Sequence, residues 1–408
     1  MDTTVFRSFF MGGFECSTHR LRSGHRLDVI GATAHDRFAR QDYQRLASVG
    51  MRTARDGLRW HLIEPSPGVY DFSSVLPMLA AARAADVEVI WDLLHYGWPD
   101  DLDIFSDAFV DRFAELARVF VKLATRETKG PLWIVPVNEI SFFAWAGGDV
   151  GILNPFARHR GDELKLQLVR ATIAAIDSMR HVNPEVRIVH TEPMINVVPH
   201  SNRAHEAVAA ERHRDAQYAA LDMIAGRTHP ELGGREDYLG VLGVNYYIYN
   251  QWVFPGGHGT TIEPSQPQYR PVWQMLGEVY NRYRRPLFIA ETGIEDEARP
   301  AWLRYVGYEV RRAIREGVPV LGVCLYPVVN HPGWDDDRHC YNGLWDYADA
   351  NGEREIYEPL ARELQSEQRL LTMAPDDAPP TSGPDTHLLD VAAHWMEIRS
   401  GREDILHK

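Results

Sequence analysis

The chain has 408 residues, of which 45% are hydrophobic and 25% are charged, a balance typical of a globular protein with a large core. Its formal net charge of −14 would repel a phosphate backbone, which argues against nucleic acid as a partner. We see no apolar run of about 18 residues that would predict a membrane span, and no signal-peptide pattern at the N-terminus. The cysteines, 3 in number, are too few for a disulfide framework, so we expect a reducing compartment and a cytoplasmic location.

Short apolar runs rich in strand-forming residues alternate with longer segments of helical spacing along most of the chain. The short runs predict strands at residues 9–16, 53–58, 87–93, 133–137, 187–191, 241–246, 287–290 and 320–326. The longer segments predict helices that include residues 36–49, 75–85, 107–125, 162–181, 205–224, 272–283 and 302–316. Strands that alternate with helices pair in parallel through crossover connections, so these elements predict a closed (β/α)8 TIM barrel of the α/β class.

An open, doubly wound sheet is the alternative arrangement of the same elements. That fold usually carries a phosphate-binding loop with the spacing G-x-G-x-x-G directly after its first strand. The corresponding segment here, Gly12-Gly13-Phe14-Glu15-Cys16, lacks this spacing. The pattern therefore favours the closed barrel.

The last part of the chain differs in composition from the alternating pattern before it. We expect residues 1–370 to form the barrel, 371–386 a flexible linker, and 387–408 a C-terminal helix. Residues 374–386 are rich in Pro, Asp, Ser and Thr, whereas residues 388–400 carry apolar side chains at helical spacing. This helix would either dock on its own barrel or contact a second subunit, which would make a homo-oligomer.

Two carboxylates stand at the ends of predicted strands, where barrel enzymes place their catalytic groups. Glu139 follows the fourth strand and is preceded by Asn138, and Glu291 follows the seventh. Glycoside hydrolysis with retention needs two carboxyl groups about 5–5.5 Å apart. One attacks the anomeric carbon, while the other protonates the leaving oxygen and then activates water. The pair predicts this chemistry, with Glu291 as nucleophile and Glu139 as acid/base.

With these two motifs in place, the sequence resembles the clan A glycoside hydrolases, and most closely the family 1 β-glucosidases, as a divergent member. The resemblance extends over most of residues 9–347. Its strand 4 motif Asn-Glu-Pro is similar to Asn138-Glu139-Ile140, and its strand 7 motif Thr-Glu-Asn-Gly is similar to Ala290-Glu291-Thr292-Gly293. Further similar segments are Arg55 with Trp60 and Pro67-Gly68, His95-Tyr96-Gly97-Trp98-Pro99, Asn245-Tyr246-Tyr247, and Phe14-Glu15.

The resemblance implies a role for each matching side chain, and no cofactor or metal. Asn138 would bind the sugar 2-OH, and Arg55 and Tyr247 would flank Glu291 and lower its pKa. Glu15 and His95 would bind ring hydroxyls, and Asn245 would also contact the substrate. Aromatic side chains that could stack on the sugar are Trp98, Trp145, Tyr326 and Trp334.

Some positions depart from the family pattern and leave the identity of the sugar open. Tyr326 stands where the family has Trp, and Gly333 stands where the family has a Glu that holds the distal hydroxyls of glucose. Glu15 replaces a neutral amide, which would suit a different hydroxyl pattern or an amino sugar. The acidic residues 335–337 follow Trp334 and could supply distal contacts.

Other site classes fit the sequence less well. The histidines show neither H-x-H nor H-E-x-x-H spacing, and residues 335–337 lack the spacing of a calcium loop, so we expect no metal. Cys16 has no evident base, and packing is its expected role. Two rival functions remain open, namely a transglycosidase with the same residues and a non-catalytic carbohydrate-binding barrel that partners a sugar-processing enzyme.

Overall fold

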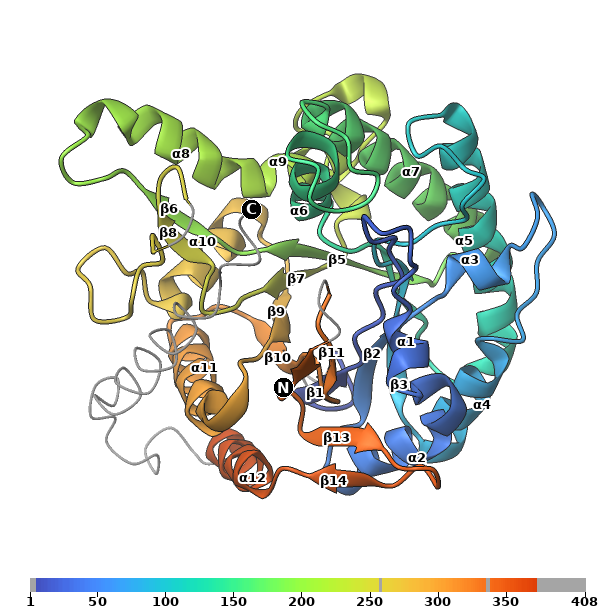
Figure 1. The fold of residues 1–408 in the computed structure, drawn as a ribbon. Helices are drawn as coiled ribbons and strands as arrows, with labels where there is room; N and C mark the ends of the chain where they lie inside the picture. The colour runs from blue at the N-terminus through green and yellow to red at the C-terminus, as the bar shows by residue number, and fades with distance from the viewer. Residues whose placement is uncertain (1–4, 257–258, 335–337, 373–408) are drawn as a thin grey trace.

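The computed structural model describes residues 5–256, 259–334 and 338–372. Its centre is a closed barrel of parallel strands, seen nearly end-on in Figure 1. In the order in which they pair, the strands are β1 (Phe10–Gly13), β2 (Thr53–Gly57), β3 (Glu88–Leu94), β4 (Trp133–Val137), β5 (Arg187–Pro193), β7 (Val241–Asn245), β9 (Leu287–Thr292) and β10 (Val320–Leu325). Pairing of Phe10 with Val323 closes the ring. The predicted (β/α)8 barrel is confirmed, and the open sheet is excluded.

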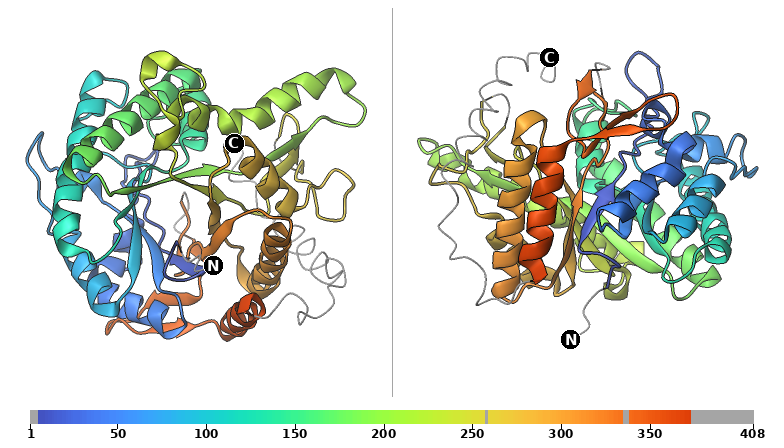
Figure 2. Two further views of the ribbon diagram at one scale, coloured as in Figure 1. Left: turned by 180° about the vertical axis from the view of Figure 1, so that it is seen from behind. Right: turned by 90° about the horizontal axis from the view of Figure 1, so that it is seen from below.

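Helices surround the barrel, as both views in Figure 2 show. The principal ones are α2 (His35–Ser48), α4 (Leu76–Ala85), α5 (Asp107–Glu127), α7 (Gly161–Val182), α10 (Val272–Tyr283), α11 (Arg299–Arg315) and α12 (Glu358–Thr372). Shorter helices are α1 (Val29–Ala32), α3 (Trp60–Ile63) and α6 (Ile140–Phe143). None of the helices within the described ranges is long and apolar enough to cross a membrane.

The helix predicted at 205–224 is divided into several pieces. A 3-10 turn (Ala216–Tyr218) separates α8 (Ala207–Asp215) from α9 (Ala219–Ile224). Buried Gln217 explains the break, because its amide bonds both backbone groups of Ile195 and the carbonyl of Arg214. These tertiary bonds outweigh the local preference for a continuous helix. Near α8, β6 (Asn196–Val198) pairs with β8 (Gln251–Val253) beyond the barrel wall (Figure 1).

The last described segments cover the barrel beside its first and last strands. Two hairpin pairs follow β10, namely β11 (His331–Pro332) with β12 (His339–Cys340), and β13 (Trp345–Ala348) with β14 (Arg354–Ile356). Helix α12 then lies beside α11 (Figure 2), where Arg304 pairs with Glu363 at 2.5 Å. Because α12 ends at Thr372, residues 371 and 372 of the predicted linker are helical. The rest of that linker and the predicted C-terminal helix lie outside the described residues.

The barrel interior is apolar at one end and polar at the other. Phe6 closes the apolar end by packing against two aromatic rings. Its ring centroid lies 4.8 Å from that of Trp133 and 5.1 Å from that of Phe288. A separate, larger apolar cluster fills the space between the strands and the helices. Because apolar side chains fill that end of the barrel interior, the polar groups inside the barrel gather at the other end, where the strands have their carboxyl ends.

Candidate active site

The two predicted carboxylates both lie at the carboxyl ends of barrel strands. Glu291 belongs to β9 and is 5% exposed, and Glu139 is the second residue after the end of β4. Strand β7 lies on the path around the barrel between β4 and β9, and its end supplies side chains to both carboxylates. Asn245 donates to Glu139, whereas Tyr247 donates to Glu291. The structure therefore brings the predicted pair to one polar mouth.

Glu291 is held by one cation and one phenol. Arg55 Nη1 donates to Glu291 Oε1 at 2.6 Å, and Tyr247 Oη donates to Oε2 at 2.9 Å. Burial nevertheless raises the pKa of Glu291 to about 7, because it outweighs the opposing effect of Arg55 and is reinforced by the negative charge of Glu139. The expected net lowering of this pKa is therefore wrong, although Arg55 acts in the expected direction.

The hydrogen-bond donors to Glu139 among the described residues are both neutral. Tyr96 Oη donates to Glu139 Oε2 at 2.6 Å, and Asn245 Nδ2 donates to Oε1 at 2.9 Å. Neutral donors can accompany a carboxyl in either protonation state, whereas an arginine favours the anion. The two carboxyls thus stand in different electrostatic surroundings.

Arg55 links the residues around the floor of the mouth. Its guanidinium forms a two-point ion pair with Asp92, with Nε–Oδ1 and Nη2–Oδ2 distances of 3.0 and 2.6 Å. Nη2 also donates to Asn138 Oδ1 at 2.7 Å. All three side chains are fully buried. Removing one partner of such a network leaves an uncompensated buried charge, so the network fixes the position of the Arg55 side chain beside Glu291.

The amide of Asn138 has a defined orientation. Its Oδ1 accepts hydrogen bonds from Arg55 and from Thr191 Oγ1, the latter at 2.8 Å. Both of these groups are donors, so the amide nitrogen must point the other way, toward Tyr96 Oη at 3.0 Å and His95 Nε2 at 3.1 Å. Asn138 therefore presents an N–H donor to the same mouth as the carboxyls.

Glu15 and His95 lie together beside the pair. His95 Nδ1 is 2.8 Å from Asp92 Oδ2, and its Nε2 is 3.7 Å from Glu15 Oε1. Burial alone would raise the pKa of Glu15, but His95 and His331 outweigh it and lower that pKa. Glu15 also accepts the backbone N–H of Ser17 at 2.9 Å. The mouth therefore holds a carboxyl group besides Glu139 and Glu291, and this group, that of Glu15, is ionised at neutral pH.

Cys16 belongs to the hydrogen-bonded floor of the site. Its Sγ lies 3.2 Å from His95 Nδ1, and burial raises the pKa of the thiol to about 11. A protonated, buried thiol is a poor nucleophile, in agreement with the packing role expected for it. Cys16, Asp92 and His95 could in principle surround a metal, but Asp92 is already paired with Arg55. Hydrogen bonding accounts for this cluster.

The predicted aromatic side chains are placed in different surroundings. Trp334 packs against Tyr96 with ring centroids 5.6 Å apart, and the Tyr326 ring lies 5.2 Å from the guanidinium carbon of Arg55. Trp98 instead lies in the core, where its indole N–H donates to the Leu102 carbonyl at 2.9 Å. Trp145 is 44% exposed and is connected to Tyr96 through Phe142. The structure thus joins Trp334 and Tyr326 to the site but not Trp98.

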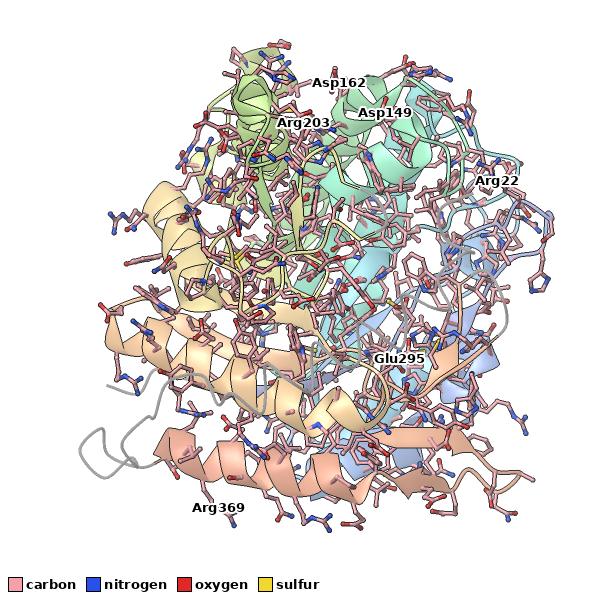
Figure 3. The ribbon with its side chains drawn as sticks, turned by 60° about the vertical axis from the view of Figure 1, so that its left-hand side comes forward. Arg22, Asp149, Asp162, Arg203, Glu295 and Arg369 are labelled. Carbon is pink, nitrogen blue, oxygen red and sulfur yellow. The ribbon has the colours of Figure 1, made fainter. Side chains whose placement is uncertain are left out.

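The rim of the mouth is tied together by contacts between loops. Arg22, after β1, donates to the Gly151 carbonyl after β4, and Arg338 pairs with Glu295, after β9, at 2.6 Å. Arg22 and Glu295 are labelled among the side chains of Figure 3. The acidic residues 335–337, expected to contribute distal contacts, lie outside the described residues.

Several side chains of the site were not predicted from the sequence. They are Asp92, Tyr96, Thr191 and Glu192. Asp92 and Glu192 lie at or near strand ends, as Glu139 and Glu291 do, so the same signal could have found them. Tyr96 carries a weaker signal, because a tyrosine in a barrel loop is most often a packing residue.

Comparison with known proteins supports the fold that the strands define. The beta-glucosidase from Thermotoga maritima in complex with glucoimidazole has a TM-score of 0.73 at 16% identity, over 90% of this chain and 98% of that one. A family 1 b-glucosidase from the same organism has a TM-score of 0.69 at 16% identity, covering 83% and 87% of the two chains. The chain has the fold of family 1 β-glucosidases. The AHE enzyme from Alicyclobacillus herbarius is similar at a TM-score of 0.72 and 18% identity, over 88% and 99% of the chains.

Sequence comparison reaches a much shorter segment. No protein-family profile matches the chain. A beta-galactosidase from Sulfolobus acidocaldarius is 34% identical over 76 residues, which is 18% of this chain and 16% of the length of that protein. The resemblance read from the motifs is thus accompanied by a shared fold, and the chemistry has to be inferred from the site itself.

Proposed function

We propose that the protein is a retaining β-glycosidase that hydrolyses a small β-glycoside by double displacement. The observation that carries this proposal is the unequal surroundings of two carboxyls at one barrel mouth. Glu291 is paired with a cation, whereas in the described part of the chain Glu139 is bonded to neutral donors. A cation favours the ionised carboxylate that attacks, whereas neutral donors can accompany the carboxylic acid that gives up a proton. Glu291 is then the nucleophile and Glu139 the acid/base.

In the first step, a Glu291 oxygen forms a bond to the anomeric carbon while the bond to the leaving oxygen breaks. Glu139 gives its proton to that leaving oxygen. The product is a glycosyl ester on Glu291. In the second step, Glu139 removes a proton from a water molecule, whose oxygen attacks the anomeric carbon and releases Glu291. Each displacement inverts the anomeric centre, so the two together retain its configuration, and the chemistry requires no cofactor.

The residues around the pair have roles that follow from their contacts. Arg55 and Tyr247 stabilise the Glu291 carboxylate and restrain its rotation. Asn138 presents its N–H to the sugar 2-OH, a contact that strengthens in the transition state. One side of the sugar-binding site is formed by Glu15, His95, Trp334 and Tyr326. The carboxylate of Glu15 accepts hydrogen bonds from ring hydroxyls.

Tyr247→Phe tests whether the phenol supports the nucleophile. Loss of a hydrogen bond to a charged group costs about 1.5–3 kcal/mol, which corresponds to roughly 10- to 100-fold in kcat/KM. Removing a donor to the anion also raises its pKa. Because catalysis needs Glu291 ionised, the acidic limb of the pH profile should move to higher pH. An unchanged acidic limb in steady-state kinetics would contradict this role.

The class of enzyme is tested by a panel of aryl β-glycosides that differ only in the sugar. Wild type and Glu291→Gly are assayed side by side, with product configuration followed by NMR. Turnover of at least one sugar by wild type alone, with the β-anomer formed first, supports the proposal and identifies the sugar. First formation of the α-anomer would contradict double displacement. No turnover across the panel would contradict hydrolysis of simple β-glycosides, and turnover only with added sugar acceptor would indicate a transglycosidase.

A further inference from the structure

A further buried carboxyl contacts the backbone next to the acid/base and takes no part in the chemistry described above. Glu192 stands near the end of β5 and is 5% exposed. Its two carboxyl oxygens lie 3.1 and 3.4 Å from the backbone nitrogen of Ser141, which donates to them. Ser141 is two residues beyond Glu139 in the chain. A buried carboxyl is costly, so this one needs an explanation.

The end of β5 holds the chain on both sides of Glu139. Thr191 O accepts the Glu139 backbone N–H at 2.9 Å, and Thr191 Oγ1 donates to Asn138 at 2.8 Å. Glu192 adds the contact on the far side, through Ser141. The segment from Asn138 to Ser141, which carries the acid/base, is therefore bonded to β5 before, at and after Glu139.

Such support is needed because the backbone at Glu139 is strained. Its φ and ψ angles are 47° and 61°, in the left-handed region that residues other than glycine seldom adopt. Conformations of this kind cost about 1–3 kcal/mol and persist only where the surroundings impose them. The turn directs the Glu139 carboxyl toward Tyr96 and Asn245, and relaxation of the turn would move the carboxyl away from both.

The electrostatics of Glu192 are compatible with this place. Burial raises the pKa of Glu192 to about 8, and the charge of Glu139 adds to the rise, whereas Ser141 and Lys165 oppose it. At neutral pH, Glu192 is therefore mainly protonated and brings no second negative charge to the acid/base. A glutamine has nearly the same shape and can accept the same N–H, so it imitates this state.

We propose that Glu192 is a positioning residue, which holds the strained turn at Glu139 so that the acid/base can reach the leaving oxygen. It acts through the Ser141 backbone and does not touch the substrate. The inference rests on the proposed glycosidase function. It goes beyond that function, because it places part of the proton-transfer geometry on β5, a strand that supplies neither catalytic carboxyl.

The test compares two leaving groups on one sugar. Phenyl and 2,4-dinitrophenyl β-glycosides of the sugar that wild type accepts are assayed with Glu192→Ala and Glu192→Gln. A poor leaving group such as phenoxide depends on proton donation, which contributes about 10²–10⁴-fold in rate. We expect Glu192→Ala to lose about 10-fold or more in kcat/KM with the phenyl glycoside, a part of that contribution, and about twofold or less with the dinitrophenyl glycoside. Glu192→Gln should restore the phenyl rate to within about threefold.

A matched control separates positioning from general loss of stability. Glu309 is likewise buried and accepts a backbone N–H, that of Trp273 at 3.1 Å, but it lies on α11 outside the barrel. Glu309→Ala should therefore change both substrates equally or not at all. If Glu192→Ala does not fold, Glu192→Asp is assayed instead, because its shorter side chain withdraws the carboxyl from Ser141 and should show the same selective loss.

The outcomes also separate this inference from the proposed function. An equal loss with both leaving groups, or no loss with either, would overturn the positioning role while wild-type turnover leaves the glycosidase function standing. Failure of Glu192→Gln to restore the phenyl rate would overturn it as well, because the contact to Ser141 would then not suffice. Absence of wild-type turnover with both glycosides would overturn the proposed function, and the positioning role with it.

Discussion

Glu291→Gly is expected to lower kcat/KM for an aryl β-glycoside by about 10⁴-fold or more, the scale of loss measured when a covalent nucleophile is removed. The physical reason is that no other described carboxyl is hydrogen-bonded to both Arg55 and Tyr247, because Asp92 is bonded to Arg55 alone of the two and Glu139 is bonded to other donors. Without a nucleophile, the glycosyl ester cannot form. Steady-state kinetics with the sugar identified by the aryl glycoside panel measure the effect.

Two controls accompany this variant. Arg55 keeps its two-point ion pair with Asp92 when Glu291 is absent, so the variant should fold, and thermal unfolding checks this. Glu297→Gly removes an exposed carboxylate six residues along the same segment and should leave the rate unchanged. Retention of a substantial part of the wild-type rate in the folded Glu291→Gly protein would show that the nucleophile has been assigned incorrectly.

Glu139→Ala should have an effect that depends on the leaving group. With poor leaving groups, the loss should approach the 10²–10⁴-fold that general acid catalysis typically contributes. With 2,4-dinitrophenolate, which leaves without a proton, formation of the glycosyl ester should be nearly unaffected. The second step should then be slow because no base activates water, so the ester should accumulate and give a burst of product. Rapid kinetics with both substrates distinguish the two steps.

Azide provides a stereochemical check on the same variant. It is a nucleophile that needs no general base, and the space left by the Glu139 carboxyl can admit it. Attack on the ester from the face opposite Glu291 gives a β-glycosyl azide, with restored turnover. An α-azide product would mean that the azide had displaced the leaving group directly, and would contradict double displacement. Wild type with azide is the control, since its own acid/base already activates water.

The barrel could be predicted from the sequence nearly strand by strand. All eight strands were located within three residues at either end. A strand inside a closed barrel is covered on both faces, so most of these strands appear as short, largely apolar runs, although β2 carries Arg55 and Asp56. The segment at 205–224 was less predictable. Its helical spacing is real, but buried Gln217 bonds to Ile195, which precedes it by 22 residues, and this divides the helix.

That Glu139 and Glu291 lie at one barrel mouth was predictable for a similar reason. In a (β/α)8 barrel, the strand ends converge on one mouth, so a carboxylate directly after a strand is already placed near the others. The resemblance to the glycosidase family placed Trp98, in the loop after β3, at the sugar. Its indole N–H in fact bonds the Leu102 carbonyl within a loop, and that bond directs the ring into the core. Position after a strand brings a residue to the mouth, but the direction of its side chain depends on its partners.

The amino-acid sequence by itself determined the order of strands and helices, the barrel they form, and the placement of Glu139 and Glu291 at one end of it. Hydrophobic periodicity is a local property, and it survives even where identity to known structures is only 16–18%. The tertiary structure alone decided the surroundings of each carboxyl. It paired Arg55 with both Asp92 and Glu291, gave Glu139 neutral donors, and placed Glu192 behind the strained turn. Charge interactions depend on distance and burial, which chain order does not specify, because the partners come from different strands.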